Sequence, residues 1–352
     1  MRIGILGFPQ SGKTTLFNVL ARAHAPTGGY ASASGGVHIG TVQVPDPRLE
    51  ALRDLFRPKK YTPARIEYVD LAGPPGEKAG ALLPQQITAA DLILIVVRAF
   101  QNPMVPHPRG VDPVRDLREF NDELLLKDLT VLEGRLEKLR KSKQVGAKDA
   151  VDELPLLERC RDALESGTAV RDLGLDPEED KVLRGYQLVT AKPLLVVFNV
   201  GEDQVSGAGL AQAAASGPQV GAVEICGRGE MEIAELSGDE QREFMELLGI
   251  VESGLDRVIR ESYRLLGVCS FFTVGEDEVR AWTIPAHTRA VEAAGAIHSD
   301  LQRGFIRAEV ISGLDLLDSG GLAQAKAKNL MRLEGKEYPV QDGDVLNIRF
   351  SV

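Results

Sequence analysis

The segment with the most specific chemistry is residues 7–14 (GFPQSGKT), which matches the phosphate-binding pattern G-x-x-x-x-G-K-[ST] at every fixed position. Glycines in such a loop let backbone N–H groups face phosphates, and the next helix adds the positive end of its dipole. The pattern assigns the β- and γ-phosphates of a purine nucleoside triphosphate to Lys13 and a Mg²⁺ ion to the Thr14 hydroxyl. A glycine-rich turn with a surface lysine is the alternative, but the position between a strand and a helix favours nucleotide binding. The predicted phosphate contacts are Gly7, Gln10, Ser11, Gly12, Lys13, Thr14 and Thr15.

A second motif, D-x-x-G, begins at Asp70 directly after the apolar run 66–69. An aspartate at the end of a strand can hold Mg²⁺ through water, and the Gly73 N–H can then contact the γ-phosphate. Alone the motif usually marks a turn, and its distance from the phosphate loop favours function. Pro74 stands where Ras-like enzymes place the glutamine that orients the attacking water, so unassisted hydrolysis should be slow. The predicted catalytic residues are Lys13, Thr14, Asp70 and Gly73.

A third motif, residues 199–202 (NVGE), ends the apolar run 194–198. GTPases use N-K-x-D at this place, where the aspartate accepts hydrogen bonds from guanine. Glu202 is one methylene longer and the lysine is missing, so guanine selectivity should be weakened or reversed. An exposed acidic loop without a ligand is the alternative. The predicted base contacts in this loop are Asn199, Val200 and Glu202.

The elements that must position these motifs read as an α/β domain. Apolar runs at residues 2–6, 66–69, 92–97 and 194–198 are short and widely spaced, as in parallel strands buried on both faces. A strand, a phosphate loop and a helix in that order begin such a nucleotide-binding domain. Leucines 125, 129, 132, 136 and 139 alternate at intervals of four and three residues, which predicts a coiled-coil seam. We expect this helix to form a hairpin with a second helix that carries Leu157, Cys160 and Leu164.

The last part of the chain predicts a different fold. Residues 271–274 and 279–284 flank Gly-Glu-Asp and predict a β-hairpin; a helix and further strands at 306–310 and 345–350 follow. This order fits a small ubiquitin-like half-barrel. The expected organisation is a P-loop domain of residues 1–113 and 190–268, a helical insertion of residues 114–189, and a C-terminal β-grasp domain of residues 269–352.

Length, composition and the number of cysteines limit the classes of protein to which the chain can belong. The 352 residues suffice for two or three domains, and 43% hydrophobic with 26% charged residues is ordinary globular composition. The N-terminus lacks a secretion signal and no apolar run is long enough for a bilayer, so we expect a cytoplasmic protein without a membrane partner. Three widely spaced cysteines fit reduced thiols.

The formal net charge of −10 confines any RNA contact to a local basic patch. The tip of the helical hairpin offers one, although a solvated helix face would look the same. Its basic residues are Arg135, Lys138, Arg140, Lys141, Lys143 and Lys148.

Taken together, the motifs resemble the YchF/Obg-like ATPase family over nearly the whole chain. Residues 45–49 (PDPRL) and 97–102 (VRAFQN) are similar to family strings, and residues 111–113 (VDP) resemble the start of its helical arm. Residues 280–285 (RAWTIP), 304–309 (GFIRAE), 332–336 (RLEGK) and 342–344 (DGD) resemble its C-terminal TGS domain. The resemblance implies a G domain with a coiled-coil insertion and a TGS domain. It also implies ATP bound in preference to or alongside GTP, and ribosomes and RNA as partners. Cys226 and Gly227 fall where the family's last base-contacting loop lies.

Three departures from the family pattern concern the phosphate side of the site. Gln10 replaces an asparagine that could help bind K⁺, so the resemblance does not extend to potassium activation. Residues 30–38 (YASASGGVH) stand where the family has YPFCTIEPN, and Ser34 replaces the Mg²⁺-sensing threonine in a segment rich in Gly and Ala. The stretch after Gly73 is shorter and proline-rich. The predicted metal ligands are therefore Thr14, Ser34 and Asp70.

Two hypotheses remain open from the sequence. The first is a slow, Mg²⁺-dependent ATPase or GTPase whose nucleotide state controls docking on ribosomes. The second is a nucleotide-binding sensor module with little or no hydrolysis, which the altered segment 30–38 and Pro74 favour. A scaffold that works without nucleotide is a third, weaker alternative.

Overall fold

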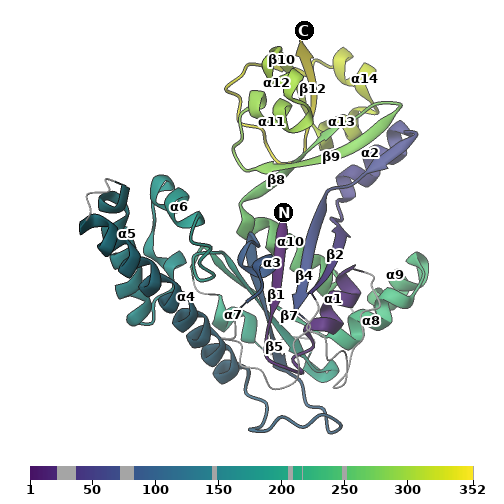
Figure 1. The fold of residues 1–352 in the computed structure, drawn as a ribbon. Helices are drawn as coiled ribbons and strands as arrows, with labels where there is room; N and C mark the ends of the chain where they lie inside the picture. Colours follow the sequence, from purple (N-terminus) through teal and green to yellow (C-terminus); the bar gives the residue numbers. More distant parts are fainter. Residues whose placement is uncertain are drawn as a thin grey trace. The chain divides into compact units, whose positions relative to one another are not determined.

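The structure, a computed structural model, describes residues 1–21, 37–71, 83–144, 149–204, 209–215, 217–247 and 252–351 (Figure 1). The chain divides into two compact units. The N-terminal unit comprises residues 1–42 and 67–265, and the C-terminal unit comprises residues 43–66 and 266–352. Each unit has its own six-stranded sheet.

The sheet of the N-terminal unit has the strand order β2-β4-β1-β5-β6-β7. Its strands are β1 (Arg2–Leu6), β2 (Val37–Gln43), β4 (Arg65–Leu71), β5 (Leu92–Ala99), β6 (Leu194–Val200) and β7 (Val220–Ile225). The pairs β1–β4, β1–β5, β5–β6 and β6–β7 are parallel. Every residue of β5 and β6 is buried, as the continuous apolar runs predicted. The carboxyl ends of β1, β4, β5 and β6 therefore lie along one edge of this sheet.

Helices surround this sheet and connect its strands. They are α1 (Lys13–Ala21), α3 (Gln85–Thr88), α7 (Leu210–Ala214), α8 (Gly227–Glu235), α9 (Gly238–Leu247) and α10 (Gly254–Leu266), with a short 3₁₀ turn at Glu202–Gln204. α3 packs on β1 so closely that a Cβ at Gly4 would lie 3.1 Å from Ile87. α10 packs on β7, where a Cβ at Gly221 would lie 3.0 Å from Leu265. α1 and α8 lie side by side (Figure 1).

The helical insertion is an arm made of α4 (Pro113–Gln144) and α5 (Asp149–Glu165), followed by a 3₁₀ turn at Val170–Leu173 and by α6 (Pro177–Arg184). The leucine seam of α4 packs on α5 as its spacing predicted, with Leu132, Leu136, Leu157 and Cys160 fully or almost fully buried. The base of the arm is fixed by Asp128, whose buried carboxylate accepts hydrogen bonds from the N–H groups of residues 189 and 190 and from the Thr190 hydroxyl.

The C-terminal unit has the strand order β11-β10-β12-β8-β9-β3. Its strands are β3 (Lys60–Thr62), β8 (Val268–Thr273), β9 (Glu278–Pro285), β10 (Phe305–Ser312), β11 (Arg332–Glu334) and β12 (Asp344–Phe350). Its helices are α2 (Pro47–Phe56), α11 (Ala290–Ile297), α12 (Ser299–Arg303), α13 (Gly313–Ser319) and α14 (Leu322–Ala327). β8 and β9 form the predicted antiparallel hairpin, and α11 covers one face of the sheet through a core that includes Phe271, Ala293 and Val310.

Residues 43–66 belong to the C-terminal unit, whereas the expected boundaries assigned them to the P-loop domain. β3 pairs in parallel with β9 at the edge of the C-terminal sheet, and α2 packs beside α13 and β9. Asp46 caps the start of α2 and, with Asp342, holds the Arg48 guanidinium over the ring of Phe272. The Arg48–Asp342 hydrogen bond, the contact of Arg48 with Phe272 and the pairing of β3 with β9 join this segment to the rest of the C-terminal unit.

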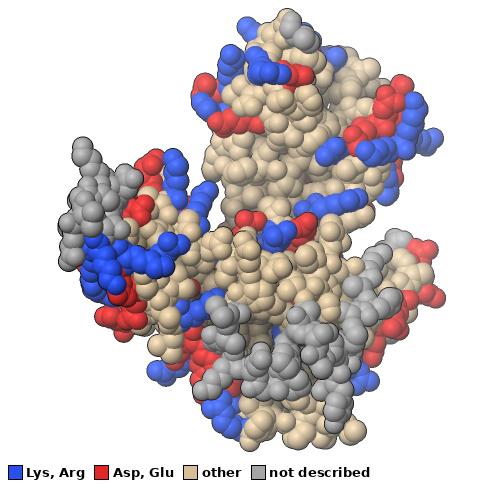
Figure 2. Space-filling view, in the orientation of Figure 1, with Lys and Arg blue, Asp and Glu red and all other residues tan. Residues whose placement is uncertain are grey.

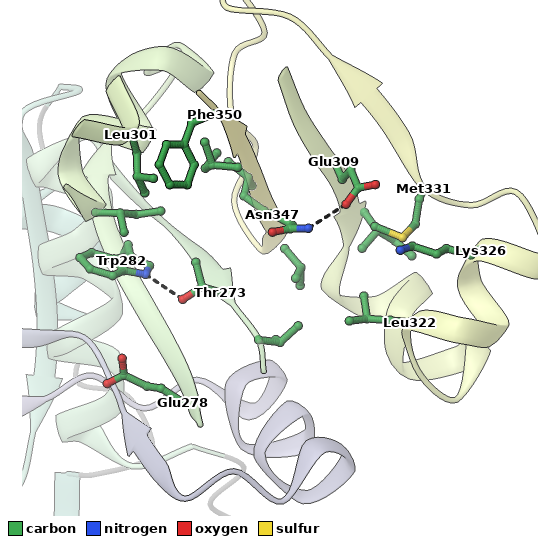
Figure 3. Close-up of a pocket in the computed structure, with 16 residues that line it drawn as sticks. Thr273, Glu278, Trp282, Leu301, Glu309, Leu322, Lys326, Met331, Asn347 and Phe350 are labelled. Atoms are coloured by element: carbon green, nitrogen blue, oxygen red, sulfur yellow. Dashed lines mark hydrogen bonds between the residues drawn. The ribbon is translucent and has the colours of Figure 1, made fainter. Parts of the chain in front are cut away.

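A cavity of about 450 Å³ opens in the C-terminal unit beside β12 (Figure 3). β12 and β8 pair at Val345 and Phe272, while β12 continues to Phe350 along β10. The cavity lies where β12 extends beyond this pair, with Trp282 and Leu301 on one side and Leu322 and Met331 on the other. Glu309 in its wall is satisfied by Asn347 and Arg349, so the carboxylate has a structural partner on its own sheet.

Candidate functional site

The phosphate loop lies between β1 and α1, as the sequence predicted. Gly7 and Gly12 have φ angles of 149° and 93°, and Gln10 between them has φ of 64°. A Cβ at Gly7 would lie 2.4 Å from the carbonyl oxygen of Val96, and one at Gly12 would lie 2.2 Å from the Asn199 amide. Only glycine combines these backbone angles with so little space. The two glycines thus bring the loop main chain against β5 and β6 ahead of the first turn of α1.

Asp70 lies beside this loop because β4 pairs with β1 in a register that sets Asp70 opposite Ile5. Its carboxylate is completely buried and accepts a hydrogen bond of 3.0 Å from the Thr14 hydroxyl. Burial raises the pKa of Asp70, while the hydrogen bond from Thr14 and the charge of Lys13 act in the opposite direction. Burial likewise lowers the pKa of Lys13, opposed by the charge of Asp70. Thr14 and Asp70 are therefore in direct contact, and the charge of Lys13 acts on the same carboxylate.

Several buried polar atoms at this point lack a hydrogen-bond partner among the described residues: Ser11 Oγ, His38 Nδ1 and Asp70 Oδ1. Ser11 is 1% exposed and Asp70 is 0% exposed. Unpaired buried oxygens cost free energy unless a ligand satisfies them. Asp70 Oδ1, on the carboxylate that the Thr14 hydroxyl contacts, is a hard oxygen of the kind that Mg²⁺ prefers, and the Ser11 hydroxyl can donate to a phosphate. In the described part of the chain, no group of three or more His, Cys, Asp or Glu residues could hold a metal by itself.

Asn199 joins the phosphate loop to the loop after β7. Its side-chain N–H donates to the backbone oxygen of Ser11 at 3.1 Å, and its side-chain oxygen accepts from the Gly227 N–H at 3.0 Å. Both bonds are buried, so the amide is committed to tying the two loops together. The Cys226 thiol caps the start of α8 by accepting from the Gly229 N–H. The predicted base loops are thus held next to the phosphate loop.

A cavity of about 950 Å³ lies in the N-terminal unit along these loops. Its walls come from the phosphate loop, from the segment after β5, from the loop after β6 and from the start of α8. Predicted site residues in its lining are Gly12, Thr15, Asn199, Val200, Glu202 and Cys226. Further lining residues that the sequence analysis did not assign to the site include Phe100, Gln101, Asn102, Leu210, Arg228 and Met231. A volume of this size accommodates a nucleoside next to the phosphate loop.

Glu202 and Arg228 form an ion pair of 3.2 Å at this cavity. Both side chains are largely exposed, at 60% for Glu202 and 78% for Arg228. The motif N-x-x-E placed Glu202 at the cavity, but nothing in the sequence indicated its cationic partner 26 residues later. Arg228 also pairs with Glu232 at 3.5 Å, so Glu202 shares its cationic partner with a second carboxylate.

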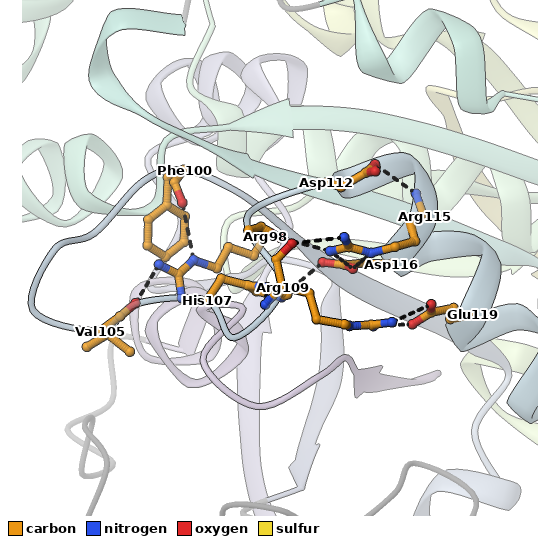
Figure 4. A network of polar contacts seen from close by, with 10 residues as sticks. Arg98, Phe100, Val105, His107, Arg109, Asp112, Arg115, Asp116 and Glu119 are labelled. Atoms are coloured by element: carbon orange, nitrogen blue, oxygen red, sulfur yellow. Dashed lines mark hydrogen bonds and ion pairs between the residues drawn. The ribbon is translucent and has the colours of Figure 1, made fainter.

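The segment that follows β5 and lines the cavity is fixed by a polar network (Figure 4). Arg98 is 4% exposed and donates to the backbone oxygens of Phe100 and Val105. His107 lies 3.3 Å from the buried carboxylate of Asp116, which also pairs with Arg115 at the start of α4. These contacts connect the cavity wall to the base of the arm. No pattern in the sequence indicated this role for His107.

The basic residues of the arm are only partly free. Arg135, Lys138, Arg140 and Lys141 are exposed, and Figure 2 shows the Lys and Arg side chains of the arm interspersed with Asp and Glu. Arg140 pairs with Glu158 at 2.8 Å and Lys141 with Glu137 at 2.7 Å. The side chains of Lys143 and Lys148 lie outside the described residues, as do the predicted site residues Ser34 and Gly73. An RNA contact at this tip stays a prediction.

The described helices include none that combines the length and the apolar character required to cross a bilayer. The longest, α4, is strongly charged along its 32 residues.

Known proteins resemble this chain over almost its whole length. Residues 2–133 match the family model of the 50S ribosome-binding GTPases, and residues 268–351 match the model YchF-GTPase_C, described as a protein of unknown function. The chain is 43% identical over 361 residues to the ribosome-binding ATPase YchF of Bacillus subtilis, with 99% of each chain covered. It is 40% identical over 362 residues to the protein of the same name from Escherichia coli O157:H7. Among solved structures, the Schizosaccharomyces pombe YchF GTPase matches with a TM-score of 0.83 and 30% identity, covering 99% of this chain and 97% of that one. These full-length matches, together with the phosphate loop and the C-terminal β-grasp unit, show that the chain belongs to the YchF family.

Proposed function

We propose that the protein is a P-loop NTPase that binds ATP, GTP or both with Mg²⁺, hydrolyses the β–γ phosphoanhydride bond slowly, and acts as a ribosome-associated switch in the cytoplasm. The observation that carries this proposal is the contact of Thr14 with the buried Asp70 at the end of the glycine loop that carries Lys13, with buried polar atoms that have no hydrogen-bond partner among the described residues. The names of the relatives, ribosome-binding ATPases, supply the partner.

The roles of the site residues follow from their places. Main-chain N–H groups of the phosphate loop and Lys13 would hold the β- and γ-phosphates, as in other P-loop proteins. Thr14 and Asp70, with Ser34, would hold Mg²⁺, which neutralises charge on the transferred phosphoryl group. Gly73 would contact the γ-phosphate. Remaining contacts of the proposed nucleotide site are Gly7, Gln10, Ser11, Gly12, Thr15, Asn199, Val200, Glu202, Cys226 and Gly227.

Base selectivity rests on Glu202. Its carboxylate lies at the cavity but is paired with Arg228, and it is one methylene longer than the aspartate that reads guanine in GTPases. ATP should therefore bind at least as tightly as GTP. Parallel calorimetric titrations of the purified protein with ATP and GTP, both with Mg²⁺, measure this ratio. A strong preference for GTP would refute the proposed base readout.

The rate of hydrolysis separates the enzyme from the sensor module. Pro74 supplies no side chain to orient water, so we expect slow single-turnover hydrolysis that ribosomes accelerate. Phosphate release would be followed in single-turnover reactions with and without ribosomes. No release under either condition would remove the enzyme and leave the nucleotide-binding sensor, which the same phosphate loop supports.

The basic arm and the C-terminal unit are the surfaces we propose for ribosomal RNA. The exposed Lys138 has no ion pair within the described residues, whereas two of its neighbours are paired with glutamates. A Lys138→Glu and Arg135→Glu double variant should bind ribosomes more weakly in co-sedimentation, with a smaller salt dependence. Unchanged binding would exclude the arm from the contact.

A further inference from the structure

His38 lies on β2, the edge strand of the parallel sheet, next to the strand that carries Asp70. Its Nδ1 is 3.8 Å from Asp70 Oδ2, which is too long for a hydrogen bond. The side chain is 28% exposed, yet the Nδ1 atom itself is buried and has no hydrogen-bond partner among the described residues. The imidazole nitrogen thus lies beside the Asp70 carboxylate without a hydrogen bond that satisfies it.

The position of the ring is fixed from the other side by α1. The centroids of His38 and Phe17 are 6.0 Å apart with the rings tilted by 32°, and Phe17 is almost completely buried. The neighbouring Gly40 keeps α1 close, because a Cβ there would lie 2.4 Å from the Cβ of Ala21 and 3.1 Å from the Phe17 ring. The strand is therefore packed on the helix that begins at the phosphate loop.

His38 Nδ1 lies next to the groups that would hold the ion. The Thr14 hydroxyl donates a hydrogen bond of 3.0 Å to Asp70 Oδ2, and His38 Nδ1 is 3.8 Å from the same oxygen. Asp70 would hold the ion through a water, so this nitrogen stands close to the place of that water. Asp70 Oδ1 is also unpaired, which leaves a lone pair available for the ion or its water.

We propose that His38 Nδ1 is a ligand of the divalent cation held by Thr14 and Asp70, an inference that rests on the proposed nucleotide site. Imidazole nitrogen is softer than the hydroxyl and carboxylate oxygens that Mg²⁺ prefers. Replacing a water by this nitrogen strengthens binding of Mn²⁺ and Co²⁺ more than binding of Mg²⁺. The site therefore discriminates among divalent ions differently from one built of oxygens alone.

A plainer role for His38 is an ion pair with Asp70 when the imidazole is protonated. The two roles make different predictions, since an ion-paired imidazolium has no lone pair at Nδ1 for a metal. Direct detection of a metal–nitrogen bond separates them.

The test uses the full-length protein with Mn²⁺ and a non-hydrolysable ATP analogue, with histidines labelled with nitrogen-15. Pulsed electron paramagnetic resonance should show a directly bound histidine nitrogen in the wild type, and His38→Asn should lose it. His287→Asn is the matched control, because His287 is exposed in the C-terminal unit and its φ of 63° suits asparagine. Absence of histidine coupling in the wild type, or coupling that persists in His38→Asn, would overturn the proposal.

Metal affinities provide the second readout. His38→Asn should weaken Mn²⁺ binding to the nucleotide complex about tenfold and Mg²⁺ binding by less, while the metal-free affinity for the analogue stays the same. Equal weakening for both ions would show that His38 acts only through Asp70 and would overturn the ligand role. If the wild type binds no analogue at all, the proposed function fails instead, and thermal melting of each variant verifies that it is folded.

Discussion

Among the buried aspartates of the described residues, Asp70 in the N-terminal unit and Asp344 in the C-terminal unit differ in their surroundings. Asp344 in the C-terminal unit is 3% exposed; its Oδ2 accepts hydrogen bonds from the Tyr338 hydroxyl at 2.8 Å and from the Gln341 N–H at 2.9 Å. Its Oδ1 lies 3.8 Å from Arg332. Asp70 in the N-terminal unit is 0% exposed, has one hydroxyl donor on Oδ2, and leaves Oδ1 without a hydrogen bond in the described structure.

The two carboxylates show how a buried charge that stabilises the fold differs from a buried charge that serves a binding site. A buried carboxylate surrounded by donors stabilises the fold, and removing it leaves those donors unpaired. A buried carboxylate with an unused oxygen costs free energy that a bound ligand can recover. By this criterion Asp344 belongs to the framework and Asp70 to the site.

The largest expected effect is that of Lys13→Ala. The loop loses its fixed positive charge, so affinity for the triphosphate should fall at least about 100-fold. Calorimetric titration with ATP and Mg²⁺ measures the loss, and Lys138→Ala on the arm serves as control. Unchanged ATP affinity would contradict the placement of the phosphates.

Next in size is Asp344→Ala. Loss of the carboxylate leaves the Tyr338 hydroxyl and the Gln341 N–H without their acceptor, which should lower the free energy of unfolding by about 2–3 kcal/mol. Trp282 is the sole tryptophan and lies in the same unit, so its fluorescence during urea unfolding reports this loss. A change below about 0.5 kcal/mol would show that the donors find other partners.

Asp70→Asn should stabilise the fold, whereas Asp344→Ala destabilises it. Without nucleotide the amide avoids the cost of a buried charge, so the free energy of unfolding should rise by about 1 kcal/mol. The Mg²⁺-dependent affinity for nucleotide should fall. Circular dichroism melting measures the first effect and calorimetry the second. Asp122→Asn, on the exposed side of α4, is the control and should change neither. A destabilised Asp70→Asn would place Asp70 with the framework.

The stability difference between the wild type and Asp70→Asn should depend on pH. Burial raises the pKa of Asp70, so between the unfolded value of 3.8 and the raised native value the folded state holds more protons. Stability then falls as pH rises through this window, and the charge costs most above it. The advantage of Asp70→Asn at neutral pH should therefore shrink as pH falls toward 4. Melting of both proteins across pH 4–8 tests this; a constant difference would contradict it.

The smallest effect is expected for Arg228→Ala. The Arg228–Glu202 pair is solvated on both sides, so its removal should change the free energy of unfolding by less than about 0.5 kcal/mol. Chemical denaturation at low and high salt measures this value. A larger loss would mean that the pair orders the loop after β6.

The sequence was sufficient for the parts in which local pattern and topology agree. The glycines of the phosphate loop, the apolar runs of β5 and β6 and the leucine seam of α4 each carry a period or spacing that admits few structures. Because the carboxyl ends of parallel strands meet at one sheet edge, the same patterns also predicted that Asp70 and Asn199 would lie near the loop.

Other features have no local signal. The three-residue strand β3 is too short for an alternating pattern, and its partner in β9 lies more than 200 residues later. The ion pair of Glu202 with Arg228 and the unpaired nitrogen of His38 depend on side-chain positions that only the folded chain defines. His38 is a single histidine without ligand spacing, a pattern that predicts no site in the sequence.

The excursion of residues 43–66 into the C-terminal unit affects how the chain matures during synthesis. Lys60 pairs with Glu278, so this segment leaves the ribosome 218 residues before its partner strand exists. At translation rates of about 5–20 residues per second, that interval lasts roughly 10–40 s. During this interval Leu49 and Leu52, which are fully buried in the folded protein, have no sheet to cover them. The nascent chain must keep this amphipathic helix from aggregating until its last strands emerge.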